Sequence, residues 1–410
     1  MEGESMSEWK EVKLEEILII YDKKRRPLSS IQRSSFQGQY RYYGAQGIID
    51  YIADYIFDGE YMLIAEDGEN LNSRTQPIAQ IVNGKFWVNN HAHIVRTNDK
   101  ANMYLVMLIL NNLNISSYVT GAAQPKLNQD NLKRISIYLP NKNEQDIIAG
   151  ILSSLDAKIE TNNKLNEKLE EMAQAIFKSW FVDFEPFKDN PFHETELGMI
   201  PEGWEVSTFS SIIEKLISGD WGKETPTGNY VHKVACIRGC DFENIKNGLR
   251  GKTPERFILE RNFALKQPKP NDIVVEMSGG TATVSTGRIC YITKELLDQY
   301  EGDIVCTNFC KIVRPLKGWS QYLYYYWQYK YDKKVMFCYE NGTSGIKNFA
   351  INDFIDFESI LIPPKDELIK FNSIIDNIRV KIQMNGVENT HLASLRDTLL
   401  PRLMSGELIV

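Results

Sequence analysis

The feature that constrains this chain most is an internal duplication. The start of one copy recurs with the same spacing 195 residues later: Trp9, Leu14 and Ile17 match Trp204, Phe209 and Ile212. The segment VNNHAHIVR at 88–96 resembles CTNFCKIVR at 306–314 with an offset of 218, and from Pro140 and Pro363 onward the offset stays at 223. The offset grows inside two lobes and is constant after them. We therefore expect lobes that differ in their loops, each followed by an equivalent segment.

Both constant segments have the 4-3-4-3 spacing of a coiled-coil seam. In the first, the seam positions are Ile148, Leu152, Leu155, Ile159, Asn162, Asn166, Leu169, Ala173, Ile176 and Trp180. In the second, they are Phe371, Ile375, Ile378, Ile382, Asn385, Asn389, Leu392, Arg396, Leu399 and Leu403. The first helix is predicted to begin after an N-cap at Asn141 or Asn143 and to end before Pro186. Pro401 is expected to kink or stop the second helix near Leu400, so that Leu403 leaves the seam.

Two adjacent seam positions are asparagine in both copies. A buried seam asparagine costs stability and serves as a register device, because it is satisfied only where it meets another polar group. The asparagines lie at the midpoint of each seam, so either helix orientation could bring them together. An antiparallel pairing would place Asn162 near Asn389 and Asn166 near Asn385.

Length and composition indicate a two-lobed protein. A chain of 410 residues accommodates two domains of roughly 150 to 200 residues. Hydrophobic residues make up 43% of the chain, and no apolar run approaches the ~18 residues of a membrane span. The N-terminal segment 1–10 is acidic and has no apolar signal core, so we expect a cytoplasmic protein that does not bind membranes.

The net charge of −7 is unevenly distributed. Residues 142–203 hold 6 basic and 13 acidic side chains, which accounts for the whole excess, whereas the lobes are nearly neutral. Each lobe can therefore have a basic face, and the acidic middle of the chain is a candidate protein-binding surface. The candidate subunit-interface residues there are Glu167, Glu170, Glu171, Trp180, Phe181 and Phe184.

All six cysteines fall in the second half of the chain: Cys236, Cys240, Cys290, Cys306, Cys310 and Cys338. A disulfide framework shared by two similar lobes would be distributed over both, so these cysteines are interpreted as reduced thiols. Two pairs have a spacing that suggests zinc, but they lie in strand-like sequence without a tight C-x-x-C turn. We interpret those pairs as buried core residues and expect no metal.

The lobes contain no complete catalytic motif. The near matches to a methyltransferase tetrapeptide are DNPF and IPPK, and PNDIVVEMS has serine where a nuclease would need lysine. SGGTATVSTGR lacks the spacing of a phosphate loop and is interpreted as a hairpin turn. His91 and His93 are expected to pack or to form hydrogen bonds. We therefore predict a protein without catalytic activity and without a cofactor.

Binding to DNA is easier to accommodate. The segment YDKKRRPLSS at 21–30 places four cations on a predicted loop, and SGDWGKETPTGNY occupies the matching place in the second lobe. Basic side chains contact phosphates or base edges, although the sequence does not say which residue does which. The candidates are Lys23, Lys24, Arg25, Arg26, Arg33, Arg41, Arg74, Lys223, Arg238, Lys246, Arg250 and Lys252.

Almost the whole chain resembles the specificity subunits of type I restriction-modification systems. YYGAQGIIDYI, FDGEYMLIAEDG and GKFWVNNHAHIVR resemble the first target-recognition domain, and TGAAQPKLNQDNLKRISIYLP resembles the approach to the first conserved helix. ILSSLDAKIETNNKLNEKLEEMAQAIFKSWFVDFEPF and ELGMIPEGWEV resemble the central conserved region, and LRDTLLPRLMSGEL resembles the distal one.

The resemblance implies an α+β fold with two similar mixed α/β recognition domains, separated by two long antiparallel coiled-coil helices with pseudo-twofold symmetry. The expected boundaries are 1–141 for the first domain, 142–185 for the first helix, 186–203 for a linker, 204–364 for the second domain and 365–410 for the second helix. Each domain would read half of a split site in double-stranded DNA. The helices would set the gap and bind two methylation subunits and the restriction subunits. The alternatives are a coiled-coil scaffold with protein-binding lobes and a fused methyltransferase or restriction enzyme.

Overall fold

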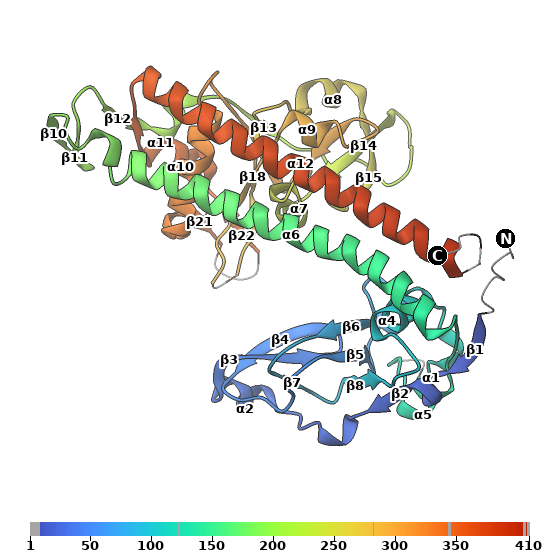
Figure 1. The fold of residues 1–410 in the computed structure, drawn as a ribbon. Helices are drawn as coiled ribbons and strands as arrows, with labels where there is room; N and C mark the ends of the chain where they lie inside the picture. Colours follow the sequence, from blue (N-terminus) through green and yellow to red (C-terminus); the bar gives the residue numbers. More distant parts are fainter. Residues whose placement is uncertain (1–8, 122–123, 282, 343–345, 405–406, 408–410) are drawn as a thin grey trace, which may run out of the picture. The chain divides into compact units, whose positions relative to one another are not determined.

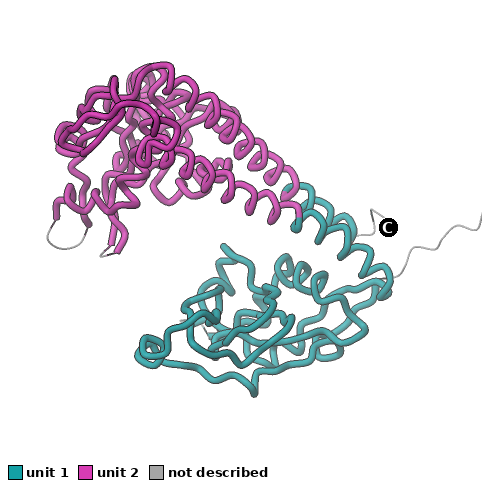
Figure 2. Tube along the Cα trace, turned by 60° about the vertical axis from the view of Figure 1, so that its left-hand side comes forward, with its two compact units in different colours: residues 1–157, 394–410 teal, residues 158–393 magenta. Residues whose placement is uncertain are grey.

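The chain forms two compact units, which are described separately. The computed structural model describes residues 9–121, 124–281, 283–342, 346–404 and 407, so most of the acidic N-terminal segment lies outside the described residues. Unit 1 comprises Met1–Ala157 and Ser394–Val410, and unit 2 comprises Lys158–Ala393 (Figure 2). Each unit combines one lobe with parts of the two long helices, α6 (Lys142–Phe181) and α12 (Lys365–Met404). The domain boundaries given above remain predictions.

The lobe of unit 1 is built on two small sheets (Figure 1). Its strands are β1 (Lys10–Lys13), β2 (Leu18–Ile20), β3 (Gln37–Gly44), β4 (Gly47–Ile52), β5 (Tyr61–Ala65), β6 (Ala79–Val82), β7 (Phe86–Val88), β8 (Ala92–Thr97) and β9 (Ser136–Leu139). Its helices and 3₁₀ turns are α1 (Leu14–Ile17), η1 (Asp22–Lys24), α2 (Ser30–Ser34), α3 (Asn70–Ser73), α4 (Met103–Asn112), η2 (Ser116–Tyr118) and α5 (Gln129–Arg134). The four-stranded sheet has the order β2-β8-β5-β6 and the three-stranded sheet the order β4-β3-β7, while β1 pairs with β9.

The core of unit 1 extends from the lobe onto both long helices. Every residue of β5 is buried, because this strand is central in its sheet. Ile148 and Leu152 of α6 join the same core, as do Leu400 and Leu403 of α12. The expectation that Pro401 removes Leu403 from the seam is therefore wrong: α12 continues through the proline to Met404.

The lobe of unit 2 has the same kinds of sheet, with additional elements. Its strands are β12 (Glu205–Thr208), β13 (Ile213–Ser218), β14 (Tyr230–Ile237), β15 (Glu255–Leu259), β16 (Ile273–Glu276), β17 (Ser278–Gly279), β18 (Ile289–Tyr291), β19 (Ile304–Cys306), β20 (Cys310–Pro315), β21 (Glu340–Asn341), β22 (Lys347–Phe349) and β23 (Ser359–Ile362). The orders are β13-β20-β16-β18, β15-β14-β19 and β17-β22-β21, while β12 pairs with β23.

Helices and turns complete unit 2: η4 (Phe209–Ile212), η5 (Gly239–Asp241), α7 (Phe242–Lys246), α8 (Glu260–Lys266), α9 (Lys294–Leu297), α10 (Ser320–Asp332), η6 (Val335–Tyr339) and α11 (Ile351–Phe357). The predicted linker contains most of η3 (Glu185–Phe187) and a hairpin of β10 (Phe192–Thr195) and β11 (Gly198–Pro201). The core is rich in aromatic residues because α10 places five buried rings, Tyr322 and Tyr324 to Trp327, against the sheet and the long helices.

The two long helices are antiparallel, as their seam asparagines show. In unit 2, Asn162 Nδ2 donates to Asn389 Oδ1 at 2.9 Å, and Asn385 Nδ2 donates to Asn166 Oδ1 at 2.8 Å. All four asparagines are buried. In unit 1, Arg396 Nη1 lies 2.6 Å from Asp156 Oδ1, which continues the same direction of pairing. The antiparallel placement of the asparagine pairs is confirmed.

The cysteines are free thiols, four of them buried in the lobe of unit 2. Burial raises the pKa of the Cys236 and Cys310 thiols to about 12. Cys240 is exposed because it lies in the turn η5 after β14, so its predicted core position is wrong. In the described parts of the chain, no helix combines the length and the apolar composition needed to cross a membrane.

Candidate nucleic-acid interface

The predicted basic loop of the first lobe is the turn η1 with the two residues that follow it. Lys23, Lys24 and Arg26 are exposed, and none of them forms an ion pair within the described residues. Arg25 lies inward, with its side chain only 15% exposed. The structure therefore separates one inward-facing arginine from three exposed cations that form no ion pair among the described residues, and Arg25 does not belong among the DNA-contact candidates.

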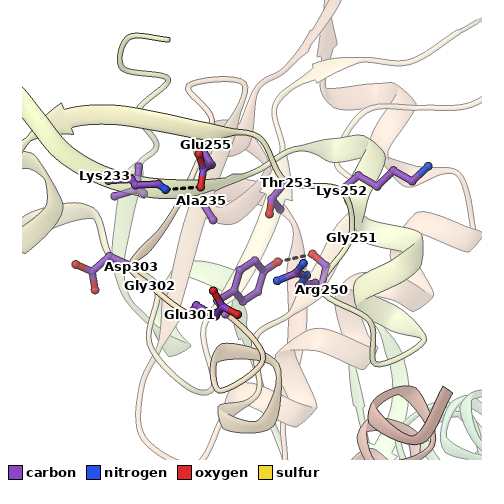
Figure 3. A pocket seen from close by; sticks show the side chains of 12 residues that line it. Lys233, Ala235, Arg250, Gly251, Lys252, Thr253, Glu255, Glu301, Gly302 and Asp303 are labelled. Carbon is purple, nitrogen blue, oxygen red and sulfur yellow. Dashed lines mark hydrogen bonds and ion pairs between the residues drawn. The ribbon is translucent and has the colours of Figure 1, made fainter. Parts of the chain in front are cut away.

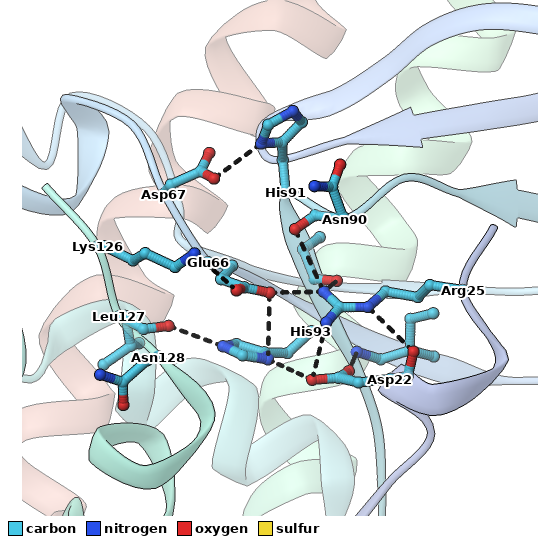
Figure 4. Close-up of polar contacts among 12 residues, drawn as sticks. Asp22, Arg25, Glu66, Asp67, Asn90, His91, His93, Lys126, Leu127 and Asn128 are labelled. Carbon is cyan, nitrogen blue, oxygen red and sulfur yellow. Dashed lines mark hydrogen bonds and ion pairs between the residues drawn. The ribbon is translucent and has the colours of Figure 1, made fainter. Parts of the chain in front are cut away.

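Arg25 is held by a cluster of polar groups beneath the turn (Figure 4). Its Nη1 donates to Glu66 Oε2 at 2.6 Å and to the carbonyl of Ala92 at 2.9 Å. Its Nη2 lies 3.5 Å from Asp22 Oδ2. Because Glu66 follows β5 and Ala92 begins β8, the arginine fastens the turn to two strands of the central sheet.

His93 completes this cluster from the buried side. Its Nδ1 lies 2.6 Å from Asp22 Oδ2, and its Nε2 lies 2.8 Å from the carbonyl of Leu127. Both ring nitrogens thus face oxygen acceptors, and the side chain is 1% exposed. Burial alone would raise the pKa of Asp22, but hydrogen bonds from His93 and the Ile94 amide, with the charges of His93 and Arg25, hold this pKa below its ordinary value of 3.8.

The cluster has the residue types of a metal site. Ligand atoms of Asp22, Glu66 and His93 all lie within 4.8 Å of one another. However, the guanidinium of Arg25 already contacts both carboxylates, at 2.6 Å and 3.5 Å. The guanidinium therefore lies between the two carboxylates, and such pairing is how buried charges are usually satisfied. We assign the cluster to holding the turn in place.

Other loops meet the same cluster. Lys126 Nζ lies 3.3 Å from Glu66 Oε1, and the amide of Leu127 donates to the Glu66 carbonyl at 2.8 Å. His91 Nδ1 lies 2.7 Å from Asp67 Oδ2 (Figure 4). Segments after β2, after β5, before β8 and before α5 are consequently fixed to one another. The sequence alone did not predict these anchors, although Asp22 comes two residues after β2 and Glu66 directly after β5.

Three further candidates in the first lobe have partners. Arg33 Nε donates to Asp50 Oδ2 at 2.8 Å. Arg41 donates to the carbonyl of Asn83, and its guanidinium lies 5.7 Å from the Tyr43 ring. Arg74 has a φ of 52° and donates to two carbonyls at the end of α4, those of Leu110 at 3.0 Å and Asn111 at 2.8 Å. Burial lowers the pKa of Arg74, and this residue leaves the set of DNA-contact candidates.

The candidates of the second lobe are dispersed. Lys223 is exposed, lies 5.7 Å from the Tyr230 ring and pairs through its backbone with β15. Arg238 is committed to Asp241, which it contacts through Nε at 3.1 Å, and this raises the pKa of its guanidinium. Lys246 is half-buried at the end of α7. Of these three, only Lys223 is an exposed cation without an ion pair among the described residues.

Arg250 and Lys252 line a cavity of about 680 Å³ in the second lobe (Figure 3). The wall also contains Lys233, whose Nζ lies 2.5 Å from Glu255 Oε1. Glu301 and Asp303 add further negative charge. The cavity therefore has no excess of positive charge, and a phosphate group would meet carboxylates on its walls.

The aromatic residues of the predicted interface on α6 pack within unit 2. Phe181 is 1% exposed and packs against Tyr322, with ring centroids 4.8 Å apart. Trp180 and Phe184 also pack against the core of unit 2. Glu170 accepts a hydrogen bond from the Tyr325 hydroxyl at 3.2 Å. These residues bind the protein's own lobe, while Glu167 and Glu171 remain exposed.

One face of the helix pair in unit 2 is exposed and partly apolar. The ion pair Lys158–Glu388, 3.3 Å long, marks this face. Leu165 and Met172 follow Lys158 by one and two heptads, and Ile374 precedes Glu388 by two. Since heptad-related residues stay on one side of a paired helix, the three apolar side chains share the face. They are 39%, 46% and 38% exposed, respectively.

Comparisons with known proteins agree with this architecture. Residues 6–171 match the family model described as the type I restriction modification DNA specificity domain. The chain is 30% identical over 297 residues to the type I restriction enzyme MjaIX specificity subunit of Methanocaldococcus jannaschii, covering 71% of this chain and 64% of that relative. It is 23% identical over 417 residues to the HindI specificity subunit of Haemophilus influenzae, covering 86% and 84%. The crystal structure of a type I S subunit from M. genitalium has the same fold, with a TM-score of 0.57, 14% identity and 98% of both chains covered.

Proposed function

We propose that this chain, which belongs to the family of type I restriction-modification specificity subunits, reads a split DNA site with its two lobes and has no catalytic centre of its own. The observation that carries the proposal is the presence of two lobes of matching topology in one chain. Two similar but different readers specify an asymmetric, two-part sequence, which a symmetric dimer of one reader does not.

The strand orders support the interpretation of the lobes as diverged copies. The order β2-β8-β5-β6 in one lobe corresponds to β13-β20-β16-β18 in the other. A three-stranded sheet with one parallel pair occurs in both, β3 with β7 and β14 with β19. The pairing of β1 with β9 has its counterpart in β12 with β23. Equivalent loops are thus available in both lobes for contact with DNA.

The basic turn is the strongest candidate for phosphate contact in the first lobe. Lys23, Lys24 and Arg26 are exposed without carboxylate partners among the described residues, so binding DNA costs them no internal ion pair. Each phosphate neutralised releases counterions and makes binding depend on salt. The buried cluster of Asp22, Arg25, Glu66 and His93 would hold the turn in position.

The test measures the affinity of the assembled complex for DNA as a function of salt. Replacing Lys23, Lys24 and Arg26 by alanine should reduce the slope of log K against log salt by up to about 2.7, at ~0.9 per phosphate contact. Lys10→Ala/Lys13→Ala, which removes two exposed cations of β1, serves as the control and should leave the slope unchanged. A wild-type complex whose DNA binding is independent of salt would instead favour a protein-binding scaffold.

The same proposal includes the partner subunits. We assign the exposed face of Leu165, Met172 and Ile374 to docking of the methylation subunits, since its exposed apolar side chains run along a helix pair and suit an amphipathic helix. Exposed Glu167 and Glu171 lie on the same helix and favour a basic partner segment. The restriction subunits would join through this assembly, and the helix pair would set the gap between the half-sites.

A further inference from the structure

The second lobe contains an insertion that the first lobe lacks. In the first lobe, β3 and β4 are joined by a two-residue turn at 45–46. In the second lobe, β14 and β15 are joined by residues 238–254, which include η5 and α7. After α7, the insertion turns through Asn247 and Gly248, and this turn lies directly against the two long helices.

The contact with α12 is closer than any side chain permits. A Cβ atom added at Gly386 would lie 2.3 Å from the Gly248 carbonyl oxygen and 2.4 Å from its carbonyl carbon. In the other direction, a Cβ at Gly248 would lie 2.7 Å from the Ile382 carbonyl oxygen, and Gly248 has a φ of +79°. Glycine in the interior of a helix is destabilising relative to alanine. Its place in α12 is explained by backbone packing on backbone.

Hydrogen bonds fasten the same turn on both sides. Asn166 Nδ2 donates to the Asn247 carbonyl at 3.2 Å, while its Oδ1 accepts from Asn385 Nδ2 at 2.8 Å. Gln299 Nε2 donates to the Gly248 carbonyl at 2.9 Å. The seam asparagine therefore joins three segments: its own helix, the opposite helix and the insertion of the lobe.

We propose that Asn166, Asn247, Gly248, Gln299 and Gly386 form a clamp that locks the second recognition domain to the helix pair in a single register. If α12 slipped or rotated by one residue, it would bring a side chain to the position of Gly386, where Gly248 leaves no room. The clamp therefore fixes where the second half-site is read relative to the helices. This inference rests on the proposed DNA recognition. It assigns these five residues a positioning role, because they help to set the gap between the half-sites.

The main test is Gly386→Ala in the assembled methylation complex, assayed on DNA substrates whose gap varies by single base pairs. Relieving a 2.3 Å contact requires the lobe to shift by roughly 1 Å, and a displacement of that size lowers rates by about 10- to 100-fold. We expect such a loss of methylation rate on DNA with the native gap. The rate on DNA with neighbouring gaps, divided by the rate at the native gap, should rise. Gly150→Ala is the matched control, since a Cβ at this helical glycine meets nothing within 4 Å.

A second variant separates loss of folding from loss of the clamp. Gln299→Ala removes the hydrogen bond to Gly248 without adding an atom to the interface, and we expect the same broadening of the gap with a smaller loss. In the isolated chain, hydrogen exchange of the α12 amides near Gly386 should accelerate in both variants and stay unchanged in Gly150→Ala. The clamp would be overturned if Gln299→Ala and folded Gly386→Ala both kept the hydrogen-exchange rates and the gap preference of the wild type. A wild-type complex that methylates no two-part site would overturn the proposed function, and the exchange measurement would still decide the clamp.

Discussion

The buried asparagine pair Asn162–Asn389 gives a quantitative test of how the seam is held. Asn389 accepts a hydrogen bond from Asn162 and donates one to Asn163 Oδ1, each 2.9 Å long. Replacing Asn389 alone by leucine removes two bonds of about 1 kcal/mol net each and leaves polar atoms facing an apolar side chain. We therefore expect a loss of about 2 kcal/mol, which lowers the melting temperature by roughly 4 to 8 °C in a unit of this size.

The double variant Asn162→Leu/Asn389→Leu should behave differently. With both polar groups gone, no fully buried seam amide is left without a partner, and two leucines restore an ordinary apolar seam layer. Asn163 loses its bond from Asn389, but it is only half-buried, so water can replace that donor. Asn162 also donates to Glu388 at 2.7 Å, but Glu388 is 45% exposed and keeps Lys158 as its partner. We expect the double variant to unfold at or above the wild-type temperature, with a coupling energy of about 1 to 3 kcal/mol between the sites.

The assay is thermal or urea unfolding followed by helical circular dichroism on the four proteins of the cycle. Asn377→Leu, at an exposed position of the same helix, is the control and should change stability by no more than about 0.5 kcal/mol. The reasoning is refuted if the double variant is as destabilised as the sum of the single variants, because the asparagines would then contribute independently of each other.

Three further predictions concern the lobes and the helix surface. Asp22→Asn should destabilise unit 1 at pH 7, and the difference in stability from the wild type should shrink as the pH falls below 3.8. The reason is that a carboxyl whose pKa is lowered on folding stabilises the folded state only while it is ionised. Urea unfolding at pH 7 and pH 3 measures this difference, and a difference that does not change with pH would contradict the prediction. Leu165→Glu/Met172→Glu should reduce co-purification of the methylation subunit without lowering the melting temperature of the chain, and undiminished recovery would rule out this face. Replacing residues 204–362 by the matching lobe of a relative should change one half of the methylated site, and a change in both halves would disprove the assignment of one lobe to one half-site.

Regularities of spacing allowed much of the architecture to be predicted. The heptad pattern located both helices, and Asn141 is the N-cap of α6, with its Oδ1 accepting from the Glu144 amide at 3.1 Å. The paired asparagines predicted how the helices meet, because a buried amide must find another polar group. These inferences succeeded because each depends on local periodicity or on a requirement that few arrangements satisfy.

The predictions that failed depended on tertiary contacts. Pro401 costs α12 about 3 kcal/mol, yet the helix continues because Leu400 and Leu403, 3% and 4% exposed, each recover about 1.5 to 3 kcal/mol by burial. Arg25 is one of four adjacent cations in the sequence, and only the positions of Glu66 and Asp22 explain why it turns inward. A local pattern shows which residues are charged, but it does not show which charges the fold itself uses.

The two long helices, α6 and α12, differ at one pair of corresponding positions. Asn163 and Gly386 are related by the constant offset of 223 residues, and each directly follows a seam asparagine, Asn162 or Asn385. In α6, the side chain of Asn163 accepts a hydrogen bond from Asn389 that supports the register of the helix pair. In α12 the corresponding residue, Gly386, has no side chain, and the backbone of Gly248 occupies the space that a Cβ atom would need. Gly386 and the insertion at 238–254 depend on each other. The insertion fits only because residue 386 has no side chain, and the glycine is tolerated in the helix because the insertion packs against it. The two helices therefore share a heptad pattern but differ in what packs against them, which is compatible with the proposed reading of an asymmetric, two-part site.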